Sequence, residues 1–138
     1  MKRLTAMGAA MGAALVIAAC SDPVPPAAPT PLPATITETF TGTLPVAGNN
    51  FIPFTVQNVG AIKVSLVGLD PGVPVGIGVG TQSTGVCTAI ESKNGVSAGP
   101  DVVLNGTATV TGGSFCVSIY DLGALTQPES YTIVVQHS

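Results

Sequence analysis

Apolar and polar residues alternate with a period of two from Thr35 onward, and this alternation constrains the fold more than any other feature of the chain. Successive side chains of a β-strand point to opposite faces, so the pattern is typical of strands with one buried face. No stretch sustains the 3.6-residue apolar period of an amphipathic helix. We therefore expect an all-β domain over residues 35–138, a small two-sheet β-sandwich of jelly-roll or Greek-key type.

Turn signals divide this domain into short strands. Pro53 indicates that the strand over 51–57 lies at an edge or contains a bulge. Asn94-Gly95 predicts a tight turn, and Gly112-Gly113 predicts a hairpin between strands at 107–111 and 114–120. The other strands are expected at 61–69, 75–80, 86–90, from 102 to 104 and 131–136. In the first strand, Ile36, Phe40 and Leu44 share one face, and the opposite face carries Thr35, Thr37, Thr39, Thr41 and Thr43.

Three glycines, Gly76, Gly78 and Gly80, form one face of the strand in which Val75, Ile77 and Val79 form the other. A strand with a bare glycine face needs another backbone or a large side chain packed closely against it. The substitution Gly78→Val distinguishes the two possibilities. If the glycine face is covered, the valine destabilises the fold by overpacking, and if the face is open to water, the valine stabilises the fold through its higher β propensity.

Residues 1–19 have the features of a secretory signal, with a positive start at Lys2 and Arg3 and an apolar stretch from Leu4 to Ile17. That stretch is shorter than the roughly 20 residues of a transmembrane helix. Removal of the leader leaves two lysines against seven acidic residues, a net charge of −5.

Ile17-Ala18-Ala19-Cys20 resembles the bacterial lipobox, an aliphatic residue and two small residues before a cysteine. The resemblance implies cleavage before Cys20, lipidation of that residue and anchoring to the membrane, because two or more acyl chains hold a protein stably. The position after the cysteine is Ser21 rather than aspartate, so the resemblance favours the outer membrane over the inner membrane of a bacterial envelope. The alternative is a plain secretory leader in which Cys20 is incidental.

Residues 20–34 combine the expected lipidated cysteine with a linker containing six prolines, at 23, 25, 26, 29, 31 and 33. Such a segment favours extended polyproline II, and fourteen residues reach roughly 40 Å at about 3.1 Å each. Lipidation of Cys20 leaves Cys87 and Cys116 to form a disulfide, which an oxidising compartment permits.

The globular part resembles the pre-peptidase C-terminal domain over most of its length. That family consists of compact β-sandwiches, usually attached to secreted proteases, so the resemblance implies a sandwich with a role in secretion, localisation or attachment. The residues that carry it are Phe40-Thr41-Gly42-Thr43-Leu44, Phe54-Thr55-Val56, the run from Gly76 to Thr81, the run from Gly113 to Asp121 and Tyr131-Thr132-Ile133-Val134-Val135.

Charge and residue inventory exclude several functions. Beyond Lys2 and Arg3 the only basic residues are Lys63 and Lys93, so we expect no nucleic-acid binding. We expect no catalytic residues and no cofactor, because the single histidine, His137, is penultimate and expected to fray, and Ser83 lacks the Gly-x-Ser-x-Gly context of a nucleophile.

Binding therefore remains as the expected function. The first hypothesis is an envelope-anchored, non-catalytic interaction or structural module, whose expected partners are the membrane, contacted through the lipid, and an envelope protein or glycan. The alternative is a glycan- or calcium-binding module. Calcium candidates near strand ends are Asp70, Asp101, Asp121 and Asn105, each of which turn chemistry also explains. Tyr120 and Tyr131 are the glycan candidates, and packing in the core or at its rim is the simpler interpretation of both. The threonine row is expected to be a solvent face rather than an array matched to ice or glycan.

Overall fold

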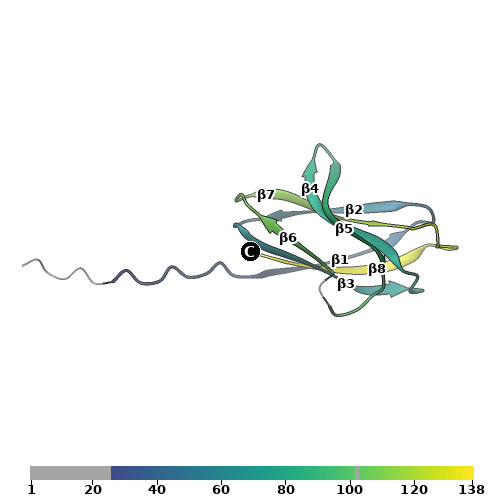
Figure 1. Cartoon of the computed structure of the whole chain (residues 1–138), viewed down its shortest axis with the longest axis horizontal. Coiled ribbons are helices and arrows are strands. Elements are labelled where there is room, and N and C mark those ends of the chain that lie inside the picture. Colours follow the sequence, from purple (N-terminus) through teal and green to yellow (C-terminus); the bar gives the residue numbers. More distant parts are fainter. Residues whose placement is uncertain (1–25, 102) are drawn as a thin grey trace, which may run out of the picture. The chain divides into compact units, whose positions relative to one another are not determined.

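The computed structural model describes residues 26–101 and 103–138 and divides the chain into two units, Met1–Pro31 and Leu32–Ser138. Residues 26–31 of the first unit are exposed and have no regular secondary structure (Figure 1). The predicted signal residues 1–19 and Cys20 lie outside the described residues. The described part of the second unit contains eight strands: β1 (Ile36–Leu44), β2 (Asn49–Val56), β3 (Gly60–Asp70), β4 (Val75–Ser83), β5 (Val86–Val96), β6 (Leu104–Ala108), β7 (Gly113–Tyr120) and β8 (Glu129–His137).

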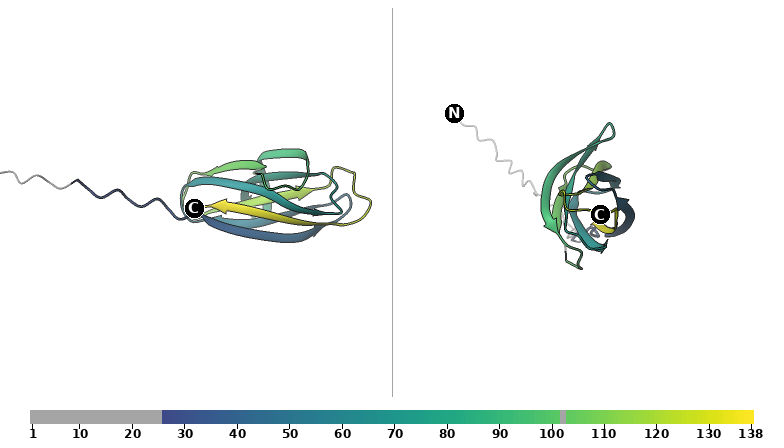
Figure 2. Two further views of the ribbon diagram at one scale, coloured as in Figure 1. Left: turned by 90° about the horizontal axis from the view of Figure 1, so that it is seen from below. Right: turned by 90° about the vertical axis from the view of Figure 1, so that its right-hand side faces the viewer.

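Two four-stranded antiparallel sheets form the two layers of the second unit (Figure 2). The strand orders are β1-β8-β3-β6 and β2-β7-β4-β5, so neighbours in space are mostly distant in sequence. Loops and strands account for every described residue of the unit, and none is helical. The prediction of an all-β, two-sheet β-sandwich is confirmed.

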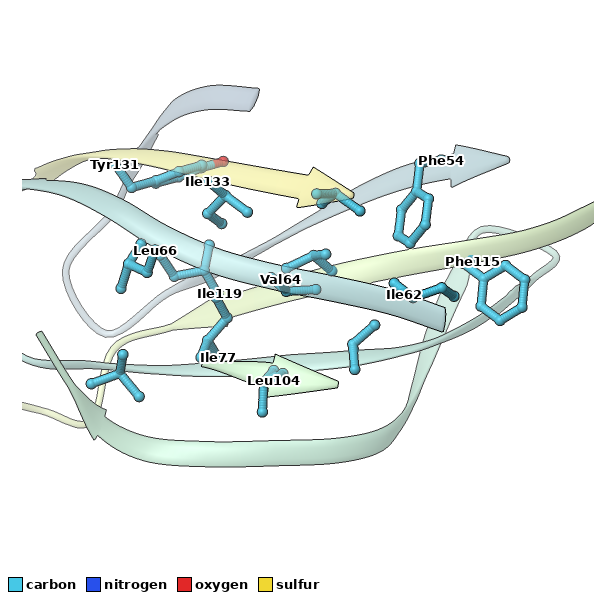
Figure 3. Packing of buried hydrophobic residues seen from close by; sticks show 14 of the residues in the cluster. Phe54, Ile62, Val64, Leu66, Ile77, Leu104, Phe115, Ile119, Tyr131 and Ile133 are labelled. Carbon is cyan, nitrogen blue, oxygen red and sulfur yellow. The ribbon is translucent and has the colours of Figure 1, made fainter. Parts of the chain in front are cut away.

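The core lies between the inner faces of the two sheets, where the predicted period-two rows interdigitate (Figure 3). Ile62, Val64 and Leu66 of β3 are fully buried and face Ile77 of β4 and Ile119 of β7 across the sandwich. Burial of each such side chain contributes about 1.5–3 kcal/mol. The alternation seen in the sequence therefore sets which face of each strand enters the core.

The edges of the sheets carry the residues expected there. Pro53 lies on β2, which pairs only with β7 and is therefore an edge strand, a place where sheets accommodate proline. The β1 threonines point outward and are exposed, while Leu44 on the opposite face is buried. The threonine row is thus a solvent face of an edge strand.

The predicted hairpin about Gly112-Gly113 is wrong. β6 pairs with β3 in one sheet, whereas β7 pairs with β2 and β4 in the other. Gly112 does make a turn, with a φ of 66° in the region that favours glycine. The chain uses this turn to cross between the layers, because each strand finds its hydrogen-bonding partner elsewhere.

The predicted tight turn at Asn94-Gly95 is also wrong, because both residues lie within β5. Gly95 has a φ of 68°, and the register with β4 shifts there, from Val75–Val96 to Ile77–Lys93. The extra residue on β5 makes this a β-bulge with glycine in the left-handed region. A second register shift places one more extra residue, Ile90, on the same strand.

Candidate functional site

The outer face of the β2-β7-β4-β5 sheet is a grid of residues set by strand register. Asn49 of β2 pairs with Tyr120 of β7, which pairs with Gly76 of β4. The next row is Phe51, Ser118 and Gly78, and the third is Pro53, Cys116 and Gly80. The glycine face predicted from the sequence therefore lies beside three side chains of β7, and we call it the glycine floor (Gly76, Gly78 and Gly80).

Each glycine of this floor is buried and closely covered. The Tyr120 ring lies over Gly76, and the carbonyl of Thr88 lies over Gly80. At Gly78 an added Cβ would meet Ser118 Oγ at 2.7 Å and the Glu91 carbonyl oxygen at 3.3 Å. Both an aromatic side chain and a backbone cover the face, which confirms the expectation of close packing.

β5 approaches this floor because it bends. Its two extra residues relative to β4, at the bulges near Ile90 and Gly95, increase the bend and twist of the strand. β4 and β5 form a hairpin that is longer than the part of β4 paired with β7, which ends at Thr81. The end of this hairpin projects from the sheet, and we call it the hairpin arm (residues 82–87; Figure 1).

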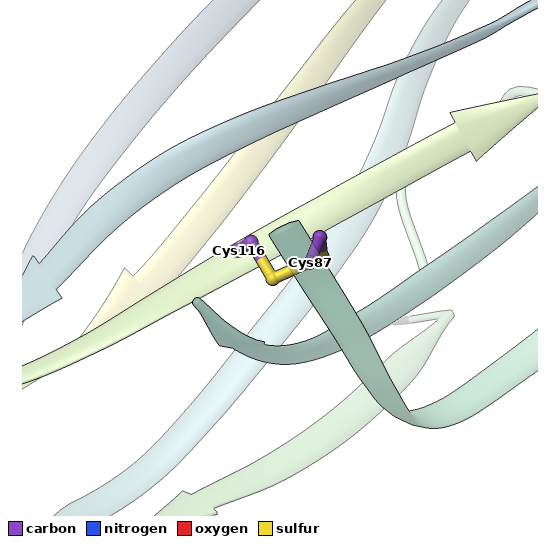
Figure 4. The surroundings of a disulfide bond; sticks show 2 residues. All are labelled: Cys87 and Cys116. Atoms are coloured by element: carbon purple, nitrogen blue, oxygen red, sulfur yellow. A yellow bond between two sulfur atoms is a disulfide. The ribbon is translucent and has the colours of Figure 1, made fainter. Parts of the chain in front are cut away.

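The Cys87–Cys116 disulfide fastens the hairpin arm to β7 (Figure 4). β5 and β7 are not neighbours, because β4 lies between them, and strands two places apart in a flat sheet are separated by about 9–10 Å. The Cα atoms of Cys87 and Cys116 are only 5.8 Å apart. β5 therefore folds over the outer face of β4, where Gly80 leaves room for it. The predicted disulfide is confirmed.

A recess of about 390 Å³ lies beside the fastened arm, and we call it the hairpin recess. Phe51 is 44% exposed at the recess, although it lies on a strand whose alternate residues enter the core. The Tyr120 hydroxyl donates a hydrogen bond of 2.7 Å to Asn94 Oδ1, which holds its ring over Gly76. The residues that line the recess are Asn49, Asn50, Phe51, Gly85, Val86, Cys87, Ser118 and Tyr120.

The structure separates the two tyrosines proposed for glycan binding. Tyr120 lines the hairpin recess. Tyr131 is only 5% exposed and belongs to the core, where its hydroxyl accepts a 3.4 Å hydrogen bond from Asn50 Nδ2. Phe51 was not among the sequence candidates, although the alternation of β2 places it outward.

The calcium candidates do not gather into a site. No group of three or more His, Cys, Asp or Glu side chains within 26–101 and 103–138 is arranged to hold a metal ion. Asp121 Oδ2 accepts from the Ala47 N–H at 2.8 Å, and Oδ1 accepts from the N–H groups of Gly123, Ala124 and Leu125. Desolvation acts to raise the pKa of Asp121, but these four hydrogen bonds outweigh it and lower the pKa below its ordinary value. The carboxylate organises its loop. Asp70, Asp101 and Asn105 are exposed.

His137 is not frayed, so that expectation is wrong. His137 is the last residue of β8 and is only 3% exposed. The centroid of its ring lies 5.7 Å from the centroid of the Phe54 ring. Its Nε2 is 3.2 Å from Glu38 Oε2 on β1. Strand pairing with Ile36 holds the chain end in place. Ser83 lies exposed on the hairpin arm.

Glu129 is a buried carboxylate that sequence reasoning missed. It is fully buried at the start of β8, and its Oε1 accepts from the N–H groups of Gly72 and Val73 at 2.7 and 2.6 Å. Glu129 and His137 both continue the buried odd-numbered row of Tyr131, Ile133 and Val135. That period-two continuation is the signal that identifies them.

Comparison with known proteins places the chain in no family. No family model matches the sequence, and no curated protein matches it either. Within the described residues, no helix is long and apolar enough to cross a membrane.

Proposed function

We propose that this chain is a lipoprotein of the bacterial envelope that displays a non-catalytic binding module. Cys20 is the anchor, residues 21–34 are the spacer, and the sandwich is the displayed part. The pre-peptidase C-terminal resemblance agrees with a localisation or attachment role. The proposed location is the outer membrane.

The lipobox and the linker support the anchoring part of this proposal. Ile17-Ala18-Ala19-Cys20 supplies the modification signal, and the proline-rich segment that follows is exposed where it is described, at 26–31. The Cys87–Cys116 disulfide fits an oxidising compartment outside the cytoplasm.

The observation that carries the binding part is the hairpin recess. A disulfide, two bulges and a glycine floor hold the hairpin arm over the sheet, so the recess is formed before any ligand arrives. Preorganisation reduces the entropy lost on binding. Three glycines within a strand each destabilise the fold by about 0.5–1 kcal/mol relative to alanine, because glycine loses more conformational entropy on folding. A sheet surface without a binding role does not require this loss of stability.

Anchoring is tested by metabolic labelling with a fatty-acid analogue in cells that express the full chain or Cys20→Ala. We expect label on the wild-type protein and none on Cys20→Ala, which should leave the membrane fraction or remain unprocessed. Ser21→Ala is the matched control and should stay labelled and anchored. Ser21→Asp should move the protein from the outer to the inner membrane fraction. Equal labelling of the wild type and Cys20→Ala contradicts the proposal.

A further inference from the structure

No charged side chain lines the hairpin recess. Its polar side-chain groups are the amide of Asn49 and the hydroxyls of Ser118 and Tyr120. The Asn50 amide points to the other face of β2, where it donates to the Thr43 carbonyl and the Tyr131 hydroxyl. A charged ligand would lose its hydration there without meeting a counter-charge, which costs free energy. The lining therefore selects a neutral ligand that offers hydroxyl or amide partners.

The β7 strand offers no backbone groups for recognition in the recess. It pairs with β2 on one side and with β4 on the other, so its N–H and C=O groups bond within the sheet. An extended peptide that binds by adding a strand needs an unpaired sheet edge, a position that β2 holds and β7 does not. Over β7, recognition thus depends on the side chains of Ser118 and Tyr120.

Two aromatic rings stand on the recess at neighbouring grid positions. Phe51 pairs in register with Ser118, and Tyr120 pairs with Asn49, which makes the two aromatic residues diagonal neighbours about 7–8 Å apart. Tyr120 is fixed by its bond to Asn94 and its contact with Gly76. A rigid aromatic ring provides contact area at a low entropic cost.

We infer that the hairpin recess binds a neutral saccharide. The C–H faces of sugar rings pack against Phe51 and Tyr120, and the sugar hydroxyls bond to the Asn49 amide and the Ser118 hydroxyl. The volume of about 390 Å³ lies within the range of about 300–1,000 Å³ for small-molecule sites. This inference rests on the proposed function, because it names the ligand of the same recess.

Calorimetric titration of the mature, lipidated protein in detergent micelles with maltotriose, cellotriose, mannotriose and chitotriose tests this inference. We expect at least one of them to bind, and Phe51→Ala to weaken that binding by about tenfold or more, as for an aromatic hot spot. Phe51→Tyr should keep the affinity. Ile90→Ala is the matched control, since Ile90 is 71% exposed but lines a different cavity, between β3, β6 and the β4–β5 edge. Its affinity should equal that of the wild type.

Affinity should also be the same at low and high salt, because a neutral ligand gains nothing from screened charges. Failure of all four saccharides to bind overturns the inference, as does binding that survives Phe51→Ala. Phe51-dependent binding of a proline-rich peptide without saccharide binding overturns it too and leaves the recess a peptide site. None of these outcomes alters the lipid labelling of Cys20, so failure here is distinguishable from failure of the proposed anchoring.

Discussion

Replacement of Gly80 with alanine tests the packing beneath the hairpin arm. A Cβ at this position would overlap the carbonyl group of Thr88, a backbone group that cannot rotate away. At Gly78 the nearest atom is instead Ser118 Oγ, at 2.7 Å, which is the end of a small side chain. Gly80→Ala must therefore move the β5 backbone substantially, whereas Gly78→Ala requires a rotation of Ser118 and a small shift of the Glu91 carbonyl oxygen, which lies at 3.3 Å.

The size of the effect follows from overpacking. Forcing extra atoms into a closely packed site costs about 1–3 kcal/mol, and a rigid backbone obstacle places Gly80→Ala at the upper end of that range. Gly78→Ala should fall at the lower end. Gly78→Val, with two further methyl groups below Glu91 and Ala89, should exceed Gly78→Ala. For a domain of this size, about 2–3 kcal/mol corresponds to a fall in Tm of roughly 8–20 °C.

Thermal and urea unfolding of the mature protein, followed by circular dichroism, measures these differences. Gly99→Ala is the matched control, because nothing lies within 4 Å of a Cβ added there. That variant should be neutral or more stable by about 0.4–1 kcal/mol, since alanine restricts the unfolded chain. A Gly80→Ala protein as stable as the wild type, or a Gly99→Ala protein equally damaged, would refute the reasoning.

Three further predictions concern the disulfide and two carboxylates. Cys87→Ser should lower the free energy of unfolding by about 3–4 kcal/mol, because the bond closes a loop of 29 residues, and the same loss should follow for Cys116→Ser in urea titration. Glu129→Ala should cost about 1.5–3 kcal/mol by removing the charged acceptor of the Gly72 and Val73 N–H groups, and Glu129→Gln should cost less, since its carbonyl still accepts. The lowered pKa of Asp121 stabilises the folded state fully above the ordinary value of 3.8, and this contribution is lost as the pH falls through the lower folded value. Asp121→Asn should therefore flatten the pH dependence of stability below about pH 4.

Local patterns were sufficient to predict most of the strands. Period-two alternation located the buried rows of β3, β7 and β8, because each strand buries one face against the other sheet. It also placed the β1 threonines outward. When the buried row of β8 is extended by two residues in each direction, it includes Glu129 and His137.

Sheet membership could not be predicted in the same way. The Gly112 turn is compatible with a hairpin or with a crossing between layers, and the choice depends on pairing with β2, β3 and β4, which lie far away in sequence. Asn94-Gly95 similarly marks a left-handed glycine, which a tight turn and a bulge both require.

The candidate site was predicted in parts. The glycine floor and the disulfide follow from the sequence, but their juxtaposition depends on the bend of β5 over β4. The bend comes from two bulges, whose positions are set by register rather than by local residues. Phe51 and Tyr120 become neighbours only through the pairing of β2 with β7.

Intact-mass spectrometry of the protein purified from its native membrane, without reduction, tests the account most directly. The predicted mass is that of residues 20–138 with a diacylglyceryl group on the Cys20 sulfur, with or without an acyl group on its amine, less two hydrogens for Cys87–Cys116. Reduction should then add two hydrogens. A mature chain that begins elsewhere, or that begins at Cys20 without acyl mass, would contradict the account.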